Sequence, residues 1–135
     1  MDLAEAYRRF PTDVECMLQL ETIRWGGTPK CPHCGTNRST RVPSERRHHC
    51  NACNSSFSVT SGTLFRRTRI PLQKWFLAVR LMLDEKRGIT IRSLADDLQV
   101  NRNTGWYVAT RIRQALRSAE SRCLLEAIAQ ANQKE

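Results

Sequence analysis

Cys31-Pro-His-Cys34 and Cys50-Asn-Ala-Cys53, with fifteen residues between them, decide the fold of the first half of this chain. Two C-x-x-C pairs at this separation are typical of a four-cysteine zinc site, in which each pair forms a tight knuckle. The two-residue spacer lets both sulfurs of a pair face the same ion, and Gly35 can supply the positive φ that such a turn often needs. We therefore predict one zinc ion bound by Cys31, Cys34, Cys50 and Cys53.

Other uses of these cysteines stay open. Two disulfides would need an oxidising compartment, but residues 1–10 do not resemble a signal peptide. A rubredoxin-like iron site uses similar pairs but needs an electron-transfer context. His48 or His49 could replace Cys50 as a ligand, although Cys50 and Cys53 already complete the tetrad. Because four thiolates fill a tetrahedral zinc site and leave no position for a catalytic water, we expect the ion to be structural.

The composition favours an anionic partner. The formal net charge is +9 and the pI is about 9.9, and 18 of the 22 basic residues are arginine, whose planar guanidinium suits phosphate and guanine. One zinc ion on four thiolates would still leave a net charge of about +7. No apolar run approaches membrane-spanning length. We expect a cytoplasmic protein with no membrane partner.

The basic residues are separated from the acidic ones along the chain. Between residues 30 and 80 there are ten basic residues and a single acid, Glu45. A second stretch, residues 99–119, has no acid and contains four arginines. A solvated charged face normally mixes both signs, so this separation favours a nucleic-acid surface.

The first half predicts a helix followed by a small β structure. Pro11 begins the helix, Thr12 and Asp13 lie at its cap, and Gly26-Gly27 ends it. We expect this helix to pack against the zinc module, which is too small to bury much apolar surface alone. Short β-prone pieces separated by turn signals then indicate a zinc ribbon; they span residues 39–42, 46–50, 56–60 and 63–65.

The second half predicts a helix-turn-helix. A helix from Pro71 to about 86–87 has apolar residues at helical spacing and should be a core element. A short helix over 91–98, a turn at 99–101 and a long helix from Arg102 follow, with Asn101 as a cap. An amphipathic helical hairpin with a charged outer face is the alternative interpretation.

The long helix should have one buried and one exposed side. We expect Trp106 to pack into the helical core and Gly105 to permit close approach of the neighbouring helix. The exposed side would carry Arg102, Asn103, Thr110, Arg113, Gln114 and Arg117, with Tyr107 at its edge. Arginine and asparagine on an exposed helix are the residue types that read guanine and adenine.

The C-terminal segment predicts one more helix, continuing or following the long one. Its apolar stripe, Leu124, Leu125 and Ile128, could dock within the molecule or support a homodimer. Cys16 and Cys123 lie in predicted helices, where we expect ordinary buried or half-buried thiols.

The predicted fold class is α+β: a small β zinc ribbon, flanked by an N-terminal helix and followed by a helical helix-turn-helix domain. The expected divisions are an N-terminal helix packing on the ribbon (1–27), the zinc ribbon (28–65), the helix-turn-helix domain (66–117) and a C-terminal helix or tail (118–135).

Several motifs, in order, resemble the N-terminal part of zinc-ribbon insertion-sequence transposases over roughly residues 10–117. They are Ile23-Arg24-Trp25, Cys31-Pro-His-Cys34-Gly35 with the second knuckle, the stretches 57–65 and 71–78, and the later Leu94–Thr104 and Arg111-Ile112-Arg113. The resemblance implies a DNA-binding module that recognises the terminal inverted repeats of a mobile element. In that family an RNase H-like domain with acidic residues and two Mg²⁺ ions follows.

This chain departs from the family there. No aspartate follows Asp97, and no strand pattern could present catalytic carboxylates. We therefore expect a non-enzymatic, sequence-specific DNA-binding protein without the catalytic domain, which would be absent or supplied by a separate chain. The alternatives are a zinc-ribbon protein–protein adaptor in a nucleic-acid-processing or transcription assembly, and a transposase completed by a second chain.

The expected DNA contacts form two groups on double-stranded DNA. The long helix would contribute Arg102, Asn103, Tyr107, Thr110, Arg113 and Arg117. Phosphate contacts would come from Arg46 and Arg47 in the ribbon and from Arg66, Arg67 and Arg69 after it.

Overall fold

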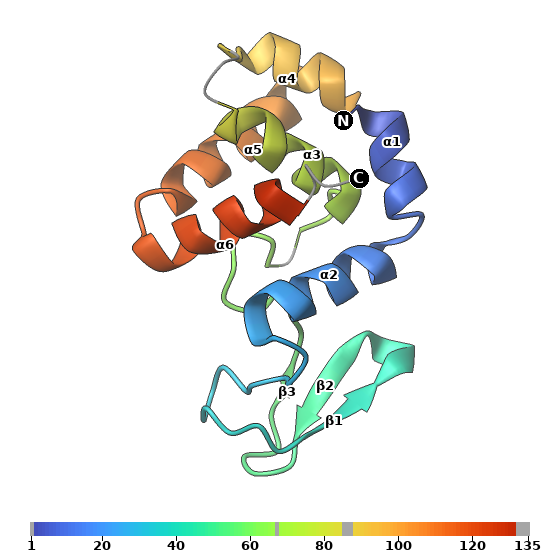
Figure 1. Cartoon of the computed structure of the whole chain (residues 1–135), viewed down its shortest axis with the longest axis vertical. Helices are drawn as coiled ribbons and strands as arrows, with labels where there is room; N and C mark the ends of the chain where they lie inside the picture. The colour runs from blue at the N-terminus through green and yellow to red at the C-terminus, as the bar shows by residue number, and fades with distance from the viewer. Residues whose placement is uncertain (1, 67, 85–87, 132–135) are drawn as a thin grey trace.

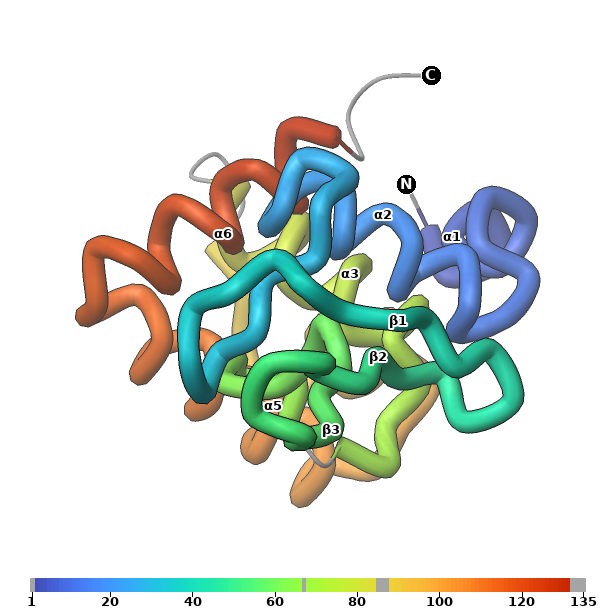
Figure 2. The backbone as a smooth tube through the Cα atoms, turned by 90° about the horizontal axis from the view of Figure 1, so that it is seen from below, coloured from blue at the N-terminus to red at the C-terminus, as the bar shows by residue number. Residues whose placement is uncertain are grey.

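The ribbon lies at one end of the molecule and a cluster of helices forms the rest. The computed structural model describes residues 2–66, 68–84 and 88–131. Figure 1 shows the sheet below the helices, with α2 between the two parts, and Figure 2 shows the sheet from below. The predicted α+β class is confirmed, with helices on both sides of the ribbon in sequence.

Two helices precede the ribbon. Helix α1, Leu3–Arg9, begins where the Asp2 carboxylate accepts a hydrogen bond from the Glu5 N–H at 2.8 Å, and it was not predicted. Helix α2, Asp13–Trp25, begins at Thr12 in a capping box and ends at Gly26, whose φ is 63°. The predicted end at Gly26 is confirmed, and the helix begins at Asp13, two residues after the predicted start at Pro11.

The ribbon is a three-stranded antiparallel sheet in the order β1–β2–β3. Strand β1 is Ser39–Val42, β2 is Arg47–Cys50 and β3 is Ser56–Phe57. A 3₁₀ turn, η1, Pro43–Glu45, joins β1 to β2.

The strand predicted at residues 63–65 is wrong. Hydrogen bonds from Thr63 N–H to Thr60 O and from Arg66 N–H to Thr63 O make consecutive turns there. Phe65 is buried, with its ring 5.5 Å from that of Trp75. Apolar residues that look like a strand in the sequence therefore anchor the exit of the ribbon in the helical core.

Helix α3, Leu72–Leu83, is the centre of the helical part. It contacts α1, α2, α4, α5 and α6, and it is buried on nearly all sides. A helix that is apolar all round is stable only when it is surrounded in this way. The helix ends at Leu83, earlier than predicted, and residues 85–87 lie outside the described part of the chain.

The helix-turn-helix is confirmed in its backbone. Helix α4, Ile91–Leu98, is capped by Thr90, and the turn places Gln99 at φ 56°. Helix α5, Arg102–Ala115, begins at Asn101, whose side-chain oxygen accepts from the Thr104 N–H at 2.8 Å.

Gly105 permits the close approach of α4 and α5, as predicted. A Cβ at this position would lie 2.8 Å from the Cβ of Ala95. Contacts this short do not occur between real Cβ atoms, so the observed helix separation needs glycine here.

Helix α6, Ala119–Ala131, follows α5 after a turn and packs on α3 and α2. Leu125 and Ile128 are fully buried there, so the C-terminal apolar stripe docks within the molecule. Cys16 is buried as expected, whereas Cys123 is exposed and lines an open cleft with Ile23 and Arg24 of α2. Within the described ranges, no helix has the length and apolar character needed to cross a membrane.

Candidate metal centre and nucleic-acid interface

The two cysteine knuckles have the same backbone structure. In each, the N–H of the first cysteine donates to the carbonyl five residues later, and its carbonyl accepts from the N–H four residues later. The four bonds are Cys31 N–H to Thr36 O at 2.9 Å, Gly35 N–H to Cys31 O at 2.9 Å, Cys50 N–H to Ser55 O at 2.8 Å, and Asn54 N–H to Cys50 O at 2.9 Å. Gly35 and Asn54 occupy equivalent positions, with φ of 77° and 59°. Asparagine is among the few non-glycine residues that adopt this conformation readily.

The four sulfurs fit one tetrahedral ion. The Sγ atoms of Cys31 and Cys53 lie 3.8 Å apart, those of Cys34 and Cys50 lie 3.5 Å apart, and all four lie within 4.8 Å of one another. Zinc–sulfur bonds of about 2.3 Å in a tetrahedron place neighbouring sulfurs about 3.8 Å apart. A disulfide, by contrast, requires about 2.05 Å. The arrangement therefore fits a single zinc ion.

The surroundings act in opposite directions on two of the thiols. The pKa of Cys34 is raised to about 12, because a lowering hydrogen bond with the backbone of Thr36 is outweighed by desolvation and by the neighbouring cysteine sulfurs. The N–H groups of His33 and Cys53 point at the sulfurs of Cys31 and Cys50, at 3.4 and 3.5 Å. Hydrogen bonds from the side chain and backbone of Ser55 lower the pKa of the Cys53 thiol to about 6. Because zinc binds thiolates, these bonds help the site to take up the ion near neutral pH.

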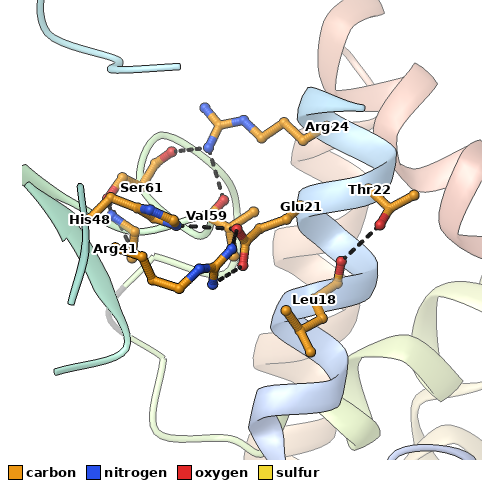
Figure 3. Close-up of polar contacts among 9 residues, drawn as sticks. Leu18, Glu21, Thr22, Arg24, Arg41, His48, Val59 and Ser61 are labelled. Carbon is orange, nitrogen blue, oxygen red and sulfur yellow. Dashed lines mark hydrogen bonds and ion pairs between the residues drawn. The ribbon is translucent and has the colours of Figure 1, made fainter. Parts of the chain in front are cut away.

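His48 joins the ribbon to α2 and is not a metal ligand. Its Nε2–H donates to a carboxylate oxygen of Glu21 at 3.2 Å, and its ring stacks on Phe57 at 5.4 Å. Burial lowers the pKa of His48, so the ring is neutral at physiological pH. The same carboxylate accepts two hydrogen bonds from Arg41, at 2.8 and 3.2 Å (Figure 3).

Glu21 is only 7% exposed, so this carboxylate is a buried charge with partners on two strands. Arg24, one turn later on α2, donates to the carbonyls of Val59 and Ser61, both at 2.8 Å (Figure 3). The ring of Trp25 meets those of His48 and Phe57 edge to face. Helix α2 is thus fixed to the ribbon through polar and aromatic contacts, as the sequence predicted in outline.

On α5 the predicted exposed residues are mostly accessible. Arg102, Asn103 and Arg113 are exposed, and Thr110 is half-buried. Arg117 is also exposed, but it lies in the turn after α5 and not on the helix as predicted, because α5 ends at Ala115. We call these five residues the predicted reading face. Within the described part of the chain, its three arginines form no ion pair or side-chain hydrogen bond.

Both aromatic residues of α5 are exposed, and of the two only Tyr107 contacts another of the described aromatic rings. Trp106, predicted to pack into the core, is 59% exposed, so that prediction is wrong. Tyr107 is 41% exposed, and its ring instead contacts Trp75 at 6.3 Å and lies below the guanidinium of Arg111 at 6.0 Å. The physical reason is the helical period: at about 100° per residue, Trp106 lies only about 20° from Arg113 around the axis.

The ribbon and the segment after it contribute the second group of arginines. Arg46, Arg47, Arg66 and Arg69 are exposed, and Arg67 lies outside the described residues. Arg46 at the hairpin turn and Arg69 before α3 line one cleft, together with the hydroxyl-bearing Thr60 and Thr68. Two arginines 23 residues apart in sequence are therefore brought to one cleft, which Asp13 also lines; the Asp13 carboxylate accepts a hydrogen bond from the Leu72 N–H at 3.1 Å.

Arg111 connects this segment to α5. Its Nη2 donates to the carbonyl of Leu64 at 2.9 Å, so the guanidinium is held by the protein. The sequence placed Arg111 within a basic stretch, but its contacts are structural. It fixes the exit of the ribbon relative to the helix-turn-helix.

Comparison with known proteins places the ribbon in a transposase context. Residues 11–56 match the transposase zinc-ribbon domain of the IS1595 type. Over 100 residues the chain is 32% identical to an uncharacterized protein in transposable element ISH50 of Halobacterium salinarum, a region covering 72% of this chain and 33% of that protein. The chain thus spans about a third of the length of this relative. No solved structure matches this chain.

The matched region agrees with the structure. Residues 11–56 contain α2, β1, β2 and both knuckles, which are the parts that the Glu21 contacts hold together. The chain therefore carries a transposase-type zinc ribbon that includes α2, and a relative of it comes from a mobile element.

Proposed function

We propose that this chain binds double-stranded DNA in a sequence-specific manner, as the DNA-recognition part of an insertion-sequence transposase. Its target would be the terminal inverted repeats of a mobile element. The observation that carries this proposal is the helix-turn-helix of α4 and α5, which presents Arg102, Asn103 and Arg113 on one accessible helix face, with neither arginine in an ion pair among the described residues.

Two features support this role beyond the helix-turn-helix itself. The transposase-type ribbon is joined to α5 through Arg111 and Leu64, so both parts can contact one duplex in a fixed arrangement. The exposed Arg46, Arg47 and Arg69 give the ribbon side a positive surface with no carboxylate partner within the described residues. Such surfaces supply the phosphate contacts that position a protein on DNA.

The proposed role is recognition and not strand cleavage. Two-metal strand transfer requires several carboxylates that converge on the ions. In the described residues, the four cysteines are the only group of three or more metal-binding side chains that come together. We assign no catalytic residue to this chain. Metal-dependent nicking of DNA by the purified chain would contradict that assignment.

Binding should be measured by fluorescence anisotropy on labelled duplexes selected from a random pool, over a series of salt concentrations. The logarithm of the affinity should fall linearly with the logarithm of the salt concentration, with a slope reduced by about 0.9 for each phosphate-binding arginine removed. Arg113→Gln and Arg117→Gln should weaken binding and reduce this slope or the preference for the selected site.

Arg8→Gln is the matched control, because Arg8 is an exposed arginine on α1, outside both proposed DNA-contact groups. This variant removes the same charge without removing a proposed contact. Equal effects of Arg8→Gln and Arg113→Gln would show only a general attraction to a polyanion. Affinity that does not change with salt would overturn the proposal.

A second function, docking of a protein partner, is favoured by a groove between α2 and the β1–β2 hairpin. Val14 and Leu18, four residues apart on α2, are 39% and 47% exposed, and they line this groove with Val42 and Pro43. An adaptor would bind an apolar segment there. Leu18→Gln adds no charge beside Arg46 and Arg47, which line the same groove, so it should abolish capture of that partner without affecting DNA binding. An unchanged partner affinity would exclude the groove.

A further inference from the structure

Trp106 lies among the residues of the predicted reading face, and its side chain is exposed although it is large and apolar. Within the described residues, the Trp106 ring makes no aromatic contact and its Nε1–H donates no hydrogen bond. The other two tryptophans behave differently: Trp75 is fully buried, and Trp25 packs on the ribbon core. Burying a large aromatic side chain gives a large hydrophobic free energy, which Trp106 forgoes in the free chain. We therefore expect a binding partner to cover it.

The position of Trp106 on the helix indicates the chemistry of that partner. At about 100° per residue, Trp106 lies within about 40° of Arg102 and Arg113 around the axis of α5, and Arg117 follows in the turn after that helix. It is thus an apolar side chain among cations, on a stretch of sequence without acids. An acidic partner must offer negative charge around an apolar contact. Duplex DNA does so in the major groove, where the thymine C5-methyl group lies between two phosphate backbones.

The level of Trp106 along α5 agrees with a base contact. Helix-turn-helix proteins contact base edges mainly with the N-terminal residues of the recognition helix. Trp106 is the fifth residue of α5, about one turn after Arg102 and Asn103. Arg113 lies about 10 Å further along the axis, and Arg117 lies in the turn after the end of α5 at Ala115.

We propose that Trp106 is a specificity-determining residue that contacts the C5-methyl group of a thymine in the major groove. This inference rests on the proposed DNA-binding function and deepens it. It assigns to Trp106 the recognition that arginine and asparagine cannot supply, because a methyl group offers no hydrogen bond. Tyr107, held against Trp75 and Arg111, would then fix the orientation of its neighbour.

Replacing thymine by deoxyuridine removes only the methyl group and tests the contact directly. Each thymine of a duplex selected by the wild-type chain would be replaced in turn, and affinities measured for the wild type and for Trp106→Ala. Losing one buried methyl should weaken wild-type binding about fourfold at one or two positions, or about 0.8 kcal/mol. Trp106→Ala should bind thymine and deoxyuridine equally at those positions.

Arg113→Gln is the matched control, because it should weaken binding yet keep the wild-type response to deoxyuridine. Fluorescence gives a second readout: iodide should quench the exposed Trp106 in the free chain, and DNA should protect it. Trp106→Phe lacks this fluorophore, so its difference from the wild type gives the fluorescence of Trp106. Since the side chain is exposed and makes no described aromatic or hydrogen-bond contact, these variants should fold normally.

The outcomes separate this inference from the function on which it rests. If the selected duplex binds but no thymine replacement matters, or if Trp106→Ala responds like the wild type, Trp106 does not read a methyl group and the DNA-binding proposal stands. If no duplex is selected and affinity does not depend on salt, both proposals are overturned.

Discussion

Substitution of Gly105 by alanine tests how closely α4 and α5 must approach to form the helix-turn-helix. The new Cβ would lie 2.8 Å from the Cβ of Ala95, and 3.3 and 3.4 Å from its Cα and N atoms. Because backbone atoms are involved, a side-chain rotation cannot relieve the contact, and α4 must move. Overpacking of this kind costs about 1–3 kcal/mol.

The intrinsic helix preference of alanine opposes this cost. In a helix interior alanine is favoured over glycine by about 1 kcal/mol, so the net destabilisation of Gly105→Ala should be about 1 kcal/mol. For a chain of this size, that corresponds to a decrease in Tm of about 3–5 °C. The net change in stability of Gly105→Ala cannot separate the overpacking cost from the helix preference of alanine. A double-mutant cycle can separate them.

Ala95→Gly removes the atom nearest to the new Cβ. In that background, Gly105→Ala should stabilise the chain by up to about 1 kcal/mol, because helix preference remains and most of the clash is gone. The predicted coupling is therefore about 2 kcal/mol. Urea unfolding with excess zinc would measure all four variants. Gly88→Ala is the control, since its Cβ would meet nothing within 4 Å. Equal effects of Gly105→Ala in both backgrounds would refute the reasoning.

Two further predictions concern buried groups. Glu21→Ala leaves the Arg41 guanidinium and the buried His48 Nε2–H without their acceptor. This substitution should therefore lower the free energy of unfolding by about 2 kcal/mol in a urea titration. Glu126→Ala, at an exposed position, is the control and should have almost no effect. Burial raises the pKa of Cys16 to about 12, whereas Cys123 is exposed. Iodoacetamide at pH 8 should therefore modify Cys123 and leave Cys16 intact in the zinc-loaded chain, which peptide mass spectrometry would show. Rapid modification of Cys16 would contradict its burial.

The features that could be predicted from the sequence are those with a local cause. The knuckles depend on pairs of cysteines three residues apart, and the helix-turn-helix on caps and a turn within a dozen residues. Asn101 caps the helix for which it was predicted, and Thr90 caps the helix before it. The tight contact at Gly105 was likewise indicated by glycine in a helix interior.

The features that were missed depend on contacts between distant segments. The buried Glu21 is explained only by Arg41 and His48, which lie 20 and 27 residues away in sequence. Leu64 and Phe65 resemble a strand, and only the central α3 shows why they are buried in a turn. Such residues need the tertiary structure before their roles become clear.

Trp106 is a different case, because a signal was present in the sequence. The helical period places it beside Arg113, yet its apolar character suggested the core. An aromatic residue within a cationic face is therefore better treated as a candidate contact than as a misplaced core residue. The division of the chain at residues 27, 65 and 117 stays a prediction.

The central claim is that one zinc ion on four thiolates organises the ribbon and, through α2, its docking on the helical core. Elemental analysis by mass spectrometry of freshly isolated, reduced chain tests it most directly. We expect one zinc ion per wild-type chain and none in either Cys31→Ser or Cys53→Ser. A folded wild-type chain that contains no zinc, or that contains iron in its place, would contradict it.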